Sequence, residues 1–192
     1  MIRPTAALFA LLACACSGPQ NGGAQTGAGA SSAQAPASGG APEAAGPAAP
    51  DFTLSSLDGQ NVSLRDYHGD KVVLLDFWST SCDPCLREMP ELVKIYKARK
   101  DKGFELLAIS VDGPDTLAQV SSVARDKGMI FPVLLDSETA VMDQYNPKGE
   151  MPFTVLIDRT GSIRLKRAGY QAGDEKSMQA LVDAIDQALA EK

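Results

Sequence analysis

Cysteine and histidine are scarce in this chain of 192 residues, which contains four cysteines and one histidine. The cysteines fall into two close pairs, Cys14 with Cys16 and Cys82 with Cys85. No further cysteine is present to form the structural disulfides that cross-link many small secreted domains. The second pair and His68 are too few ligands for a closed zinc site without help from carboxylates, so no metal site is expected.

Basic side chains are in the minority, with 18 Lys and Arg against 24 Asp and Glu and a net charge of −6. No long block of basic residues occurs in the sequence. Because nucleic acids and anionic lipid surfaces are bound largely through clustered positive charge, neither nucleic acid nor charge-driven adhesion to a membrane is expected. The sequence also lacks a motif for a nicotinamide or flavin nucleotide, so no cofactor is expected.

Long apolar runs are missing too, and none approaches the roughly 20 residues that a helix needs to span a bilayer. The chain nevertheless begins like an exported protein, with an early basic residue and a short apolar run. At the end of this run, Leu11-Leu12-Ala13-Cys14 resembles the lipobox of bacterial lipoproteins, in which the cysteine is lipidated. Residues 1–13 are therefore predicted to be a lipoprotein-type signal peptide and Cys14 the lipidation site. Lipidation of Cys16, or an ordinary signal peptide cut near Ala15, is the alternative.

Residues 14–49 are predicted to be a disordered tether. From residue 17 on they are almost wholly Ala, Gly, Ser, Pro, Gln and Asn, with Glu43 as the sole charge. Such a segment has too little apolar bulk to offset the entropy lost on ordering. A flexible chain of about 36 residues reaches roughly 30–35 Å, enough to clear lipid headgroups. The expected location is the bacterial cell envelope, with a periplasm-facing domain anchored to the membrane. A tail without an anchor is the alternative.

From residue 50 to residue 192 the composition is that of one globular domain, and its apolar pattern alternates between strand and helix spacing. The predicted elements are, in order, a hairpin over 52–64 around Asp58-Gly59, a buried strand over 71–78, a helix over 83–100, a strand over 105–111, a helix over 116–127, a short strand over 131–135, a short helix over 137–145, a hairpin of 153–158 and 163–168, and a closing helix over 176–189. This order predicts an α/β domain with a central mixed sheet and helices on both faces.

The segment Cys82-Asp83-Pro84-Cys85 carries the clearest chemical signal, because it follows the predicted buried strand and opens the predicted helix. At a helix N-terminus, free backbone N–H groups and the helix dipole stabilise a thiolate. Cys82 is therefore predicted to be the nucleophile, and Cys85, one turn further on, the resolving thiol. Asp83 is expected to oppose the thiolate and make the pair more reducing, and Pro84 to restrict the first turn. A metal half-site or an inert surface disulfide is the alternative.

Several motifs in order resemble thioredoxin and, more closely, the exported TlpA/ResA-like thiol–disulfide oxidoreductases. They are the cysteine pair with the strand before it, and the segments Ala49-Pro50-Asp51-Phe52-Thr53-Leu54, Leu57-Asp58-Gly59, Phe131-Pro132-Val133-Leu134-Leu135-Asp136 and Met151-Pro152-Phe153-Thr154-Val155-Leu156-Ile157-Asp158. The resemblance covers about residues 50–190. It implies a thioredoxin fold with an N-terminal β-hairpin extension and a βα insertion.

Two acidic residues near the cysteine pair are candidates for moving protons. Asp76 interrupts the apolar strand and matches the buried acid of thioredoxin, where burial would raise its pKa and let it take the proton of Cys85. Many TlpA/ResA-like proteins lack an acid at this position. Glu88 lies three residues after Cys85 on the same helix face and matches an acid linked to proton handling in that family. The alternatives are an aspartate that reaches water and an exposed glutamate beside Arg87.

The resemblance also implies which residues meet the substrate. Pro152 matches the cis-proline whose loop faces the cysteine pair and holds the substrate backbone, with a trans proline at an edge strand as the alternative. Met151 would touch the disulfide and shape the choice of partner. Trp78, the only tryptophan, is grouped with these two as substrate-binding, although a place in the core is also expected. Ser81 is a departure, because the family commonly has a tryptophan before the first cysteine.

Together these features predict an exported, monomeric thiol–disulfide oxidoreductase that acts on protein disulfides, more as a reductase than as an oxidant. The resemblance suggests a role such as cytochrome c maturation, with a membrane thiol carrier as the electron donor. A thiol peroxidase is one alternative, disfavoured because Ser79 stands three residues before Cys82 where a threonine is needed. A non-catalytic metal-binding chaperone is the other, disfavoured by the spacing of the cysteines and the early position of the single histidine.

Overall fold

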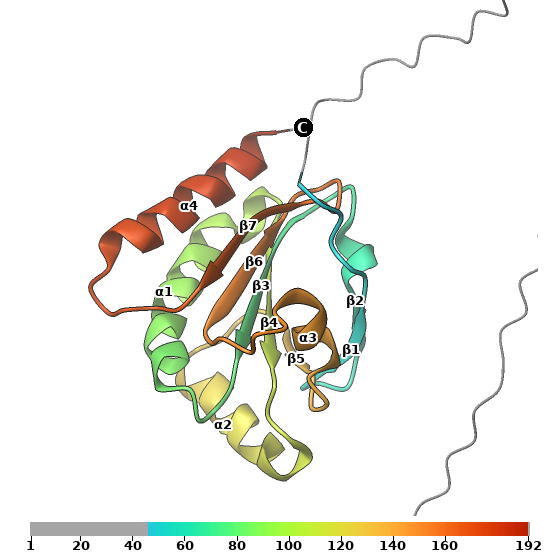
Figure 1. Cartoon of the computed structure of the whole chain (residues 1–192), viewed down its shortest axis with the longest axis vertical. Helices are drawn as coiled ribbons and strands as arrows, with labels where there is room; N and C mark the ends of the chain where they lie inside the picture. Colours follow the sequence, from blue (N-terminus) through green and yellow to red (C-terminus); the bar gives the residue numbers. More distant parts are fainter. Residues whose placement is uncertain (1–45, 192) are drawn as a thin grey trace, which may run out of the picture. The chain divides into compact units, whose positions relative to one another are not determined.

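The computed structural model describes residues 46–191 as a seven-stranded sheet with helices on both faces (Figure 1). The predicted signal peptide, Cys14 and Cys16 lie outside the described residues, as does the predicted tether up to residue 45. Within the described part of the chain, no helix is both long enough and apolar enough to cross a membrane.

The sheet is mixed, with the strand order β2-β1-β5-β4-β3-β6-β7. Its strands are β1 (Thr53–Ser56), β2 (Asn61–Ser63), β3 (Val72–Trp78), β4 (Phe104–Ser110), β5 (Val133–Leu135), β6 (Phe153–Ile157) and β7 (Ile163–Ala168). Strands β3, β4 and β5 are parallel to one another, and the remaining neighbours pair antiparallel. All seven residues of β3 are buried, as its continuous apolar run predicted.

Helices cover both faces of this sheet. The helices α1 (Asp83–Arg99), α2 (Leu117–Asp126) and α4 (Glu175–Ala190) contribute to the hydrophobic core on one face, and α3 (Ala140–Tyr145) to the core on the other. Figure 1 shows α1 and α4 on one side of the sheet and α3 on the opposite side. Alternation along β3 divides its side chains in the same way, because Leu74 belongs to the first core and Leu75 to the second. The predicted α/β architecture is confirmed.

The two predicted additions to the sheet are also present. The hairpin β1–β2 extends the sheet by pairing β1 antiparallel with β5. Its turn contains Gly59, whose φ of 81° lies in the left-handed region that glycine adopts at no steric cost. The strand β5 and the helix α3 form the βα insertion between α2 and β6.

The residues just before the predicted boundary at residue 50 also contact the sheet. Ala48 pairs with Ser162 in an antiparallel bridge, and the backbone N–H of Ile163 donates to the Pro47 carbonyl at 2.9 Å. The Ala49 N–H donates to the Gly161 carbonyl at 2.8 Å. The backbone therefore lies against the β6–β7 turn from Pro47 onward, a few residues before the predicted boundary at residue 50. Composition could not show this, because the pairing uses backbone groups that any sequence supplies.

Candidate active site

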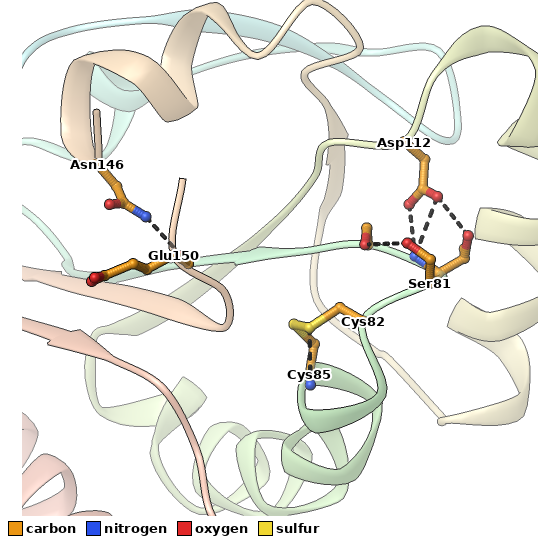
Figure 2. The surroundings of a disulfide bond; sticks show 8 residues. Ser81, Cys82, Cys85, Asp112, Asn146 and Glu150 are labelled. Atoms are coloured by element: carbon orange, nitrogen blue, oxygen red, sulfur yellow. Dashed lines mark hydrogen bonds between the residues drawn. A yellow bond between two sulfur atoms is a disulfide. The ribbon is translucent and has the colours of Figure 1, made fainter. Parts of the chain in front are cut away.

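Cys82 and Cys85 form a disulfide where the turn after β3 enters α1 (Figure 2). Cys82 is the N-cap of α1: its carbonyl accepts the Leu86 N–H at 3.0 Å, and its sulfur lies 3.3 Å from the Cys85 backbone nitrogen. Cys82 is 9% exposed and Cys85 is 1% exposed. The pair lies at the predicted start of the helix, and Cys85 is the more deeply buried of the two cysteines. A thiolate on Cys82 would lie at the positive end of a 17-residue helix.

The turn before Cys82 is held by a residue that follows the neighbouring strand β4. Asp112, just past the end of β4, lies beside this turn (Figure 2). Its carboxylate accepts the Thr80 N–H at 2.9 Å and the Ser110 hydroxyl at 2.8 Å. The Thr80 hydroxyl donates to the same carboxylate. Because β3 and β4 are parallel, their carboxyl ends meet at one edge of the sheet, and Asp112 can reach across. Asp112 therefore fixes the backbone two residues before the predicted nucleophile.

The Met151–Pro152 peptide bond is cis, as predicted. The Gly169 N–H donates to the Pro152 carbonyl at 2.8 Å, and the Asn146 side-chain amide donates to the Glu150 carbonyl at 2.7 Å (Figure 2). Pro152 is buried, and Met151 is half-buried against the hydrophobic core that includes both cysteines. The loop is thus held on both sides of the cis bond. Its contact with a substrate stays a prediction.

Asp76 is 1% exposed, on the face of β3 that α1 covers. Its Oδ1 atom has no hydrogen-bond partner among residues 46–191. Burial and then the charge of Glu88 raise the pKa of Asp76 well above its usual range, and Arg167 partly opposes them. The placement predicted from the sequence is confirmed, and an aspartate that reaches water is excluded. A carboxyl group in this environment keeps its proton to a higher pH than an exposed aspartate does.

Glu88 is 1% exposed and forms an ion pair with Arg167 of β7, whose side chain is 12% exposed. It is therefore not the exposed glutamate that neighbouring Arg87 suggested as the alternative. Burial raises the pKa of Glu88, while the charge and hydrogen bond of Arg167 oppose that rise. Two carboxyl groups and one guanidinium thus share a buried region on the same side of the sheet as the disulfide.

The remaining predicted residues divide between the core and the surface. Trp78 is fully buried, so it cannot reach a docked polypeptide; its grouping with the substrate-binding residues is wrong, and its place in the core is confirmed. Asp83 is exposed and Pro84 is partly exposed in the first turn of α1. Ser81 is exposed, with its hydroxyl 3.1 Å from that of Ser79. Cys82 is therefore flanked by small or polar side chains rather than by a flat aromatic surface.

Sequence reasoning missed Asp112 and Arg167. Asp112 lies two residues after the buried parallel strand β4, a place where polar residues often serve a site. Arg167 lies on the same face of β7 as Leu165, which packs against the core. A charged residue at a position where the alternation predicts an apolar one was the available signal. Both signals are weak alone, because charged residues at strand ends are common.

The arrangement supports chemistry at sulfur. Among the described residues, no group of three or more His, Cys, Asp or Glu side chains is placed to bind a metal ion. A disulfide at a helix N-terminus, a cis-proline loop and a mixed sheet of this order define a thiol–disulfide oxidoreductase of the thioredoxin fold.

Comparisons with known proteins agree. The profile of the AhpC/TSA family matches residues 45–166. Thiol-disulfide oxidoreductase ResA of Geobacillus kaustophilus is 41% identical over 121 residues, 63% of this chain and 67% of that protein. ResA of Bacillus cereus is 35% identical over 130 residues, 68% and 73% of the two chains. A solved structure from Chlorobium tepidum, thought to be the thiol:disulfide interchange protein DsbE, has a TM-score of 0.67 at 30% identity and covers 76% of this chain and 98% of that one. The chain belongs to the AhpC/TSA family and is a ResA-like thiol–disulfide oxidoreductase.

Proposed function

We propose that this oxidoreductase reduces protein disulfides in the bacterial cell envelope, with Cys82 as the attacking thiolate and Cys85 as the resolving thiol. The observation that carries the proposal is the unequal environment of the two sulfurs. Cys82 is the more exposed and caps the N-terminus of α1, where a thiolate is stabilised, whereas Cys85 is buried behind it. A docked polypeptide is therefore expected to react at the sulfur of Cys82 rather than at that of Cys85.

The chemistry has two sulfur-transfer steps. The Cys82 thiolate attacks one sulfur of the substrate disulfide, whose bond breaks, and the electron pair leaves with the other substrate sulfur, which takes up a proton. Asp76, as a carboxylate, then accepts the proton of Cys85, and the Cys85 sulfur attacks Cys82 in the mixed disulfide. The second substrate thiol leaves with that bond's electron pair and takes up a proton. The substrate gains two electrons and two protons, and the Cys82–Cys85 disulfide remains.

The direction of transfer follows from the charge beside the nucleophile. Asp83 is exposed in the first turn of α1 next to Cys82, so its negative charge disfavours the thiolate and hence the reduced state. We expect Asp83→Asn to raise the reduction potential by about 30 mV for each unit by which it lowers the pKa of Cys82. Equilibration of the purified domain with glutathione buffers measures this shift, and a lower potential in the variant contradicts the proposed tuning.

The setting of the reaction rests on the N-terminal sequence and on the family. The lipobox-like Leu11-Leu12-Ala13-Cys14 supports a lipid anchor at Cys14, and the resemblance to TlpA/ResA-like proteins supports a role in cytochrome c maturation. The substrate would then be the oxidised C-x-x-C-H haem attachment site of an apocytochrome. Electrons would come from a membrane thiol carrier, and the protein would act as a monomer.

Trapping of mixed disulfides tests the assigned roles. In the full-length chain exported by a bacterial host, Cys85→Ser is expected to accumulate partners bound to Cys82, because the resolving thiol is missing. Cys82→Ser is the matched control and is expected to trap far fewer. Non-reducing electrophoresis and mass spectrometry identify the partners. Equal trapping by the two variants would contradict the assignment of Cys82 as the attacking thiol and Cys85 as the resolving thiol.

Two further measurements test the setting and the alternatives. Cys14→Ser is expected to move the protein out of the membrane fraction, whereas Cys16→Ser leaves it there; retention of Cys14→Ser in the membrane contradicts the anchor. With a thiol donor present, the domain is expected to reduce a C-x-x-C-H peptide disulfide much faster than hydrogen peroxide. Faster consumption of peroxide would instead favour a thiol peroxidase.

A further inference from the structure

Unpartnered buried polar atoms are concentrated in one place. Among residues 46–191, five buried side-chain nitrogen or oxygen atoms have no hydrogen-bond partner. Four of them belong to Asp76, Glu88, Thr154 and Arg167, and the fifth is the Trp78 indole nitrogen. Buried polar groups are normally satisfied, so a cluster of exceptions calls for an explanation such as a catalytic role.

Strand register explains how three of these residues meet. Asp76 on β3 lies opposite Thr154 on β6, and Thr154 lies opposite Arg167 on β7. Directly opposed residues of neighbouring strands project from the same face of the sheet. The three side chains therefore form a polar row across three strands, on the face that α1 covers.

Helix α1 adds the fourth member. Glu88, one turn after Cys85, is buried on this face and forms its ion pair with Arg167. The groups around Asp76 are thus Ala108 on β4, Thr154 on β6, Arg167 beyond it on β7, and Glu88 on α1. One guanidinium is present for two buried carboxyl groups, so a second charge in this region stays uncompensated unless one carboxyl group holds a proton.

We propose that Arg167 is a positioning residue that keeps Glu88 ionised and thereby assigns the single proton of the carboxyl pair to Asp76 in the oxidised enzyme. The inference rests on the oxidoreductase activity and deepens it. When a donor thiolate attacks Cys82, the Cys82–Cys85 bond breaks and its electron pair goes to the Cys85 sulfur. Asp76 then gives its stored proton to that sulfur, and the resulting carboxylate is ready to accept the proton back when a substrate is reduced.

The charges decide which acid holds the proton. Arg167 contacts Glu88 directly and reaches Asp76 only across Thr154, so it favours the ionised form of Glu88 the more strongly. The ionised Glu88 in turn favours the protonated form of Asp76, and its charge is one cause of the raised pKa of Asp76, after burial. Removing the guanidinium should leave Glu88 buried without a counter-charge, and Glu88 should then take up a proton as well.

Carbon-13 NMR of the side-chain carboxyl carbons, measured in the oxidised domain as a function of pH, tests this directly. We expect Asp76 to be protonated and Glu88 ionised at neutral pH, with the two signals assigned by Asp76→Asn and Glu88→Gln. Arg167→Met is expected to raise the midpoint of Glu88 by about one to three pH units, the range typical of a carboxylate that loses an adjacent arginine. Arg167→Lys should restore an ionised Glu88.

Arg87→Met is the matched control, because it removes an exposed arginine beside Glu88; it should leave both midpoints unchanged. An ionised Asp76 beside a protonated Glu88 in the native protein would overturn the proposal, as would an Arg167→Met variant with an unchanged Glu88 midpoint. If Arg167→Met does not fold, the native titration still decides which acid holds the proton. Because no turnover is involved, the result is independent of whether the enzyme works as a reductase.

Discussion

Arg167, on the edge strand β7, donates to the carboxylate of Glu88 on α1, and the two residues are 79 positions apart in the sequence. The pair joins the last strand of the sheet to the helix that begins at the disulfide. It therefore couples the charge near the buried sulfur to a residue that no local motif contains. The electrostatics of the site depend on this long-range contact as much as on the residues between the cysteines.

Asp76→Asn is expected to change how stability depends on pH. Burial raises the pKa of Asp76 in the folded protein, so the folded state holds a proton that the unfolded chain releases above about pH 4. The free energy of unfolding of the native protein therefore falls as the pH rises from that value through the folded pKa. Asparagine removes this loss, worth about 1.4 kcal/mol for each unit between the two pKa values.

Urea unfolding of the oxidised domain between about pH 4 and pH 8 measures this difference. The variant should gain stability over the native protein as the pH rises, with the smallest gain at the acidic end. A difference that does not vary with pH would show that Asp76 ionises freely in the folded protein.

Thr154→Val is expected to stabilise the oxidised protein. The Thr154 hydroxyl is buried and has no hydrogen-bond partner among residues 46–191, and valine has nearly the same shape without the polar atom. Avoiding the desolvation of an unpaired hydroxyl is worth about 1 kcal/mol, at the low end of the measured range. Thr154→Ser is the control and should destabilise by removing a buried methyl group. Lower stability of Thr154→Val in urea would mean that the hydroxyl finds a partner in solution.

Asp112→Ala is expected to loosen the turn that precedes the nucleophile. The substitution leaves the Thr80 N–H and the Ser110 hydroxyl without their acceptor, at a cost of about 1.5–3 kcal/mol in the free energy of unfolding. Reduction of insulin should slow, because the backbone before Cys82 is less well positioned. Asp115→Ala is the control, since Asp115 is exposed, and both measurements should match the native protein there. Unchanged activity in Asp112→Ala would show that this carboxylate is not needed to position Cys82.

Ser81→Trp is expected to change partner choice rather than chemistry. Ser81 is exposed beside Cys82, so a tryptophan there would add an apolar surface for a docked chain. A well-buried aromatic contact is worth about 1.4 kcal/mol, or tenfold in kcat/KM, for peptide disulfides with apolar flanks. A small disulfide such as hydroxyethyl disulfide makes no such contact and should react at the native rate. An equal rise in kcat/KM for both substrates would show that the tryptophan changes the reactivity of Cys82 rather than the binding of the partner.

The elements of the fold could be predicted because their signals are local. The apolar spacing of α1 and its start at Cys82 lie within a single stretch of sequence, and the observed helix ends one residue before the predicted limit. The helix predicted over 116–127 is observed as α2 over Leu117–Asp126, within one residue at each end, and a 3-10 turn over Pro114–Thr116 precedes it. A proline favours the start of such a turn, but it does not decide between the hydrogen-bond pattern of a 3-10 helix and that of an α-helix.

The candidate site could be predicted only in part. Asp76 stood out as an acid in an apolar strand, and its burial followed from that position. The burial of Glu88 did not, because its neighbour Arg87 and its helical position fitted an exposed residue equally well. For Trp78 the sequence left both a substrate-binding place and a place in the core open, and its position on β3 puts it in the core.

Local sequence is enough to predict that two cysteines begin a helix after a buried strand, because helix capping and hydrophobic periodicity act between near neighbours in the chain. The support of the turn by Asp112 and the contact of Arg167 with Glu88 depend on the folded chain as a whole. Those contacts arise from strand register and helix packing, which bring together residues that the chain keeps far apart.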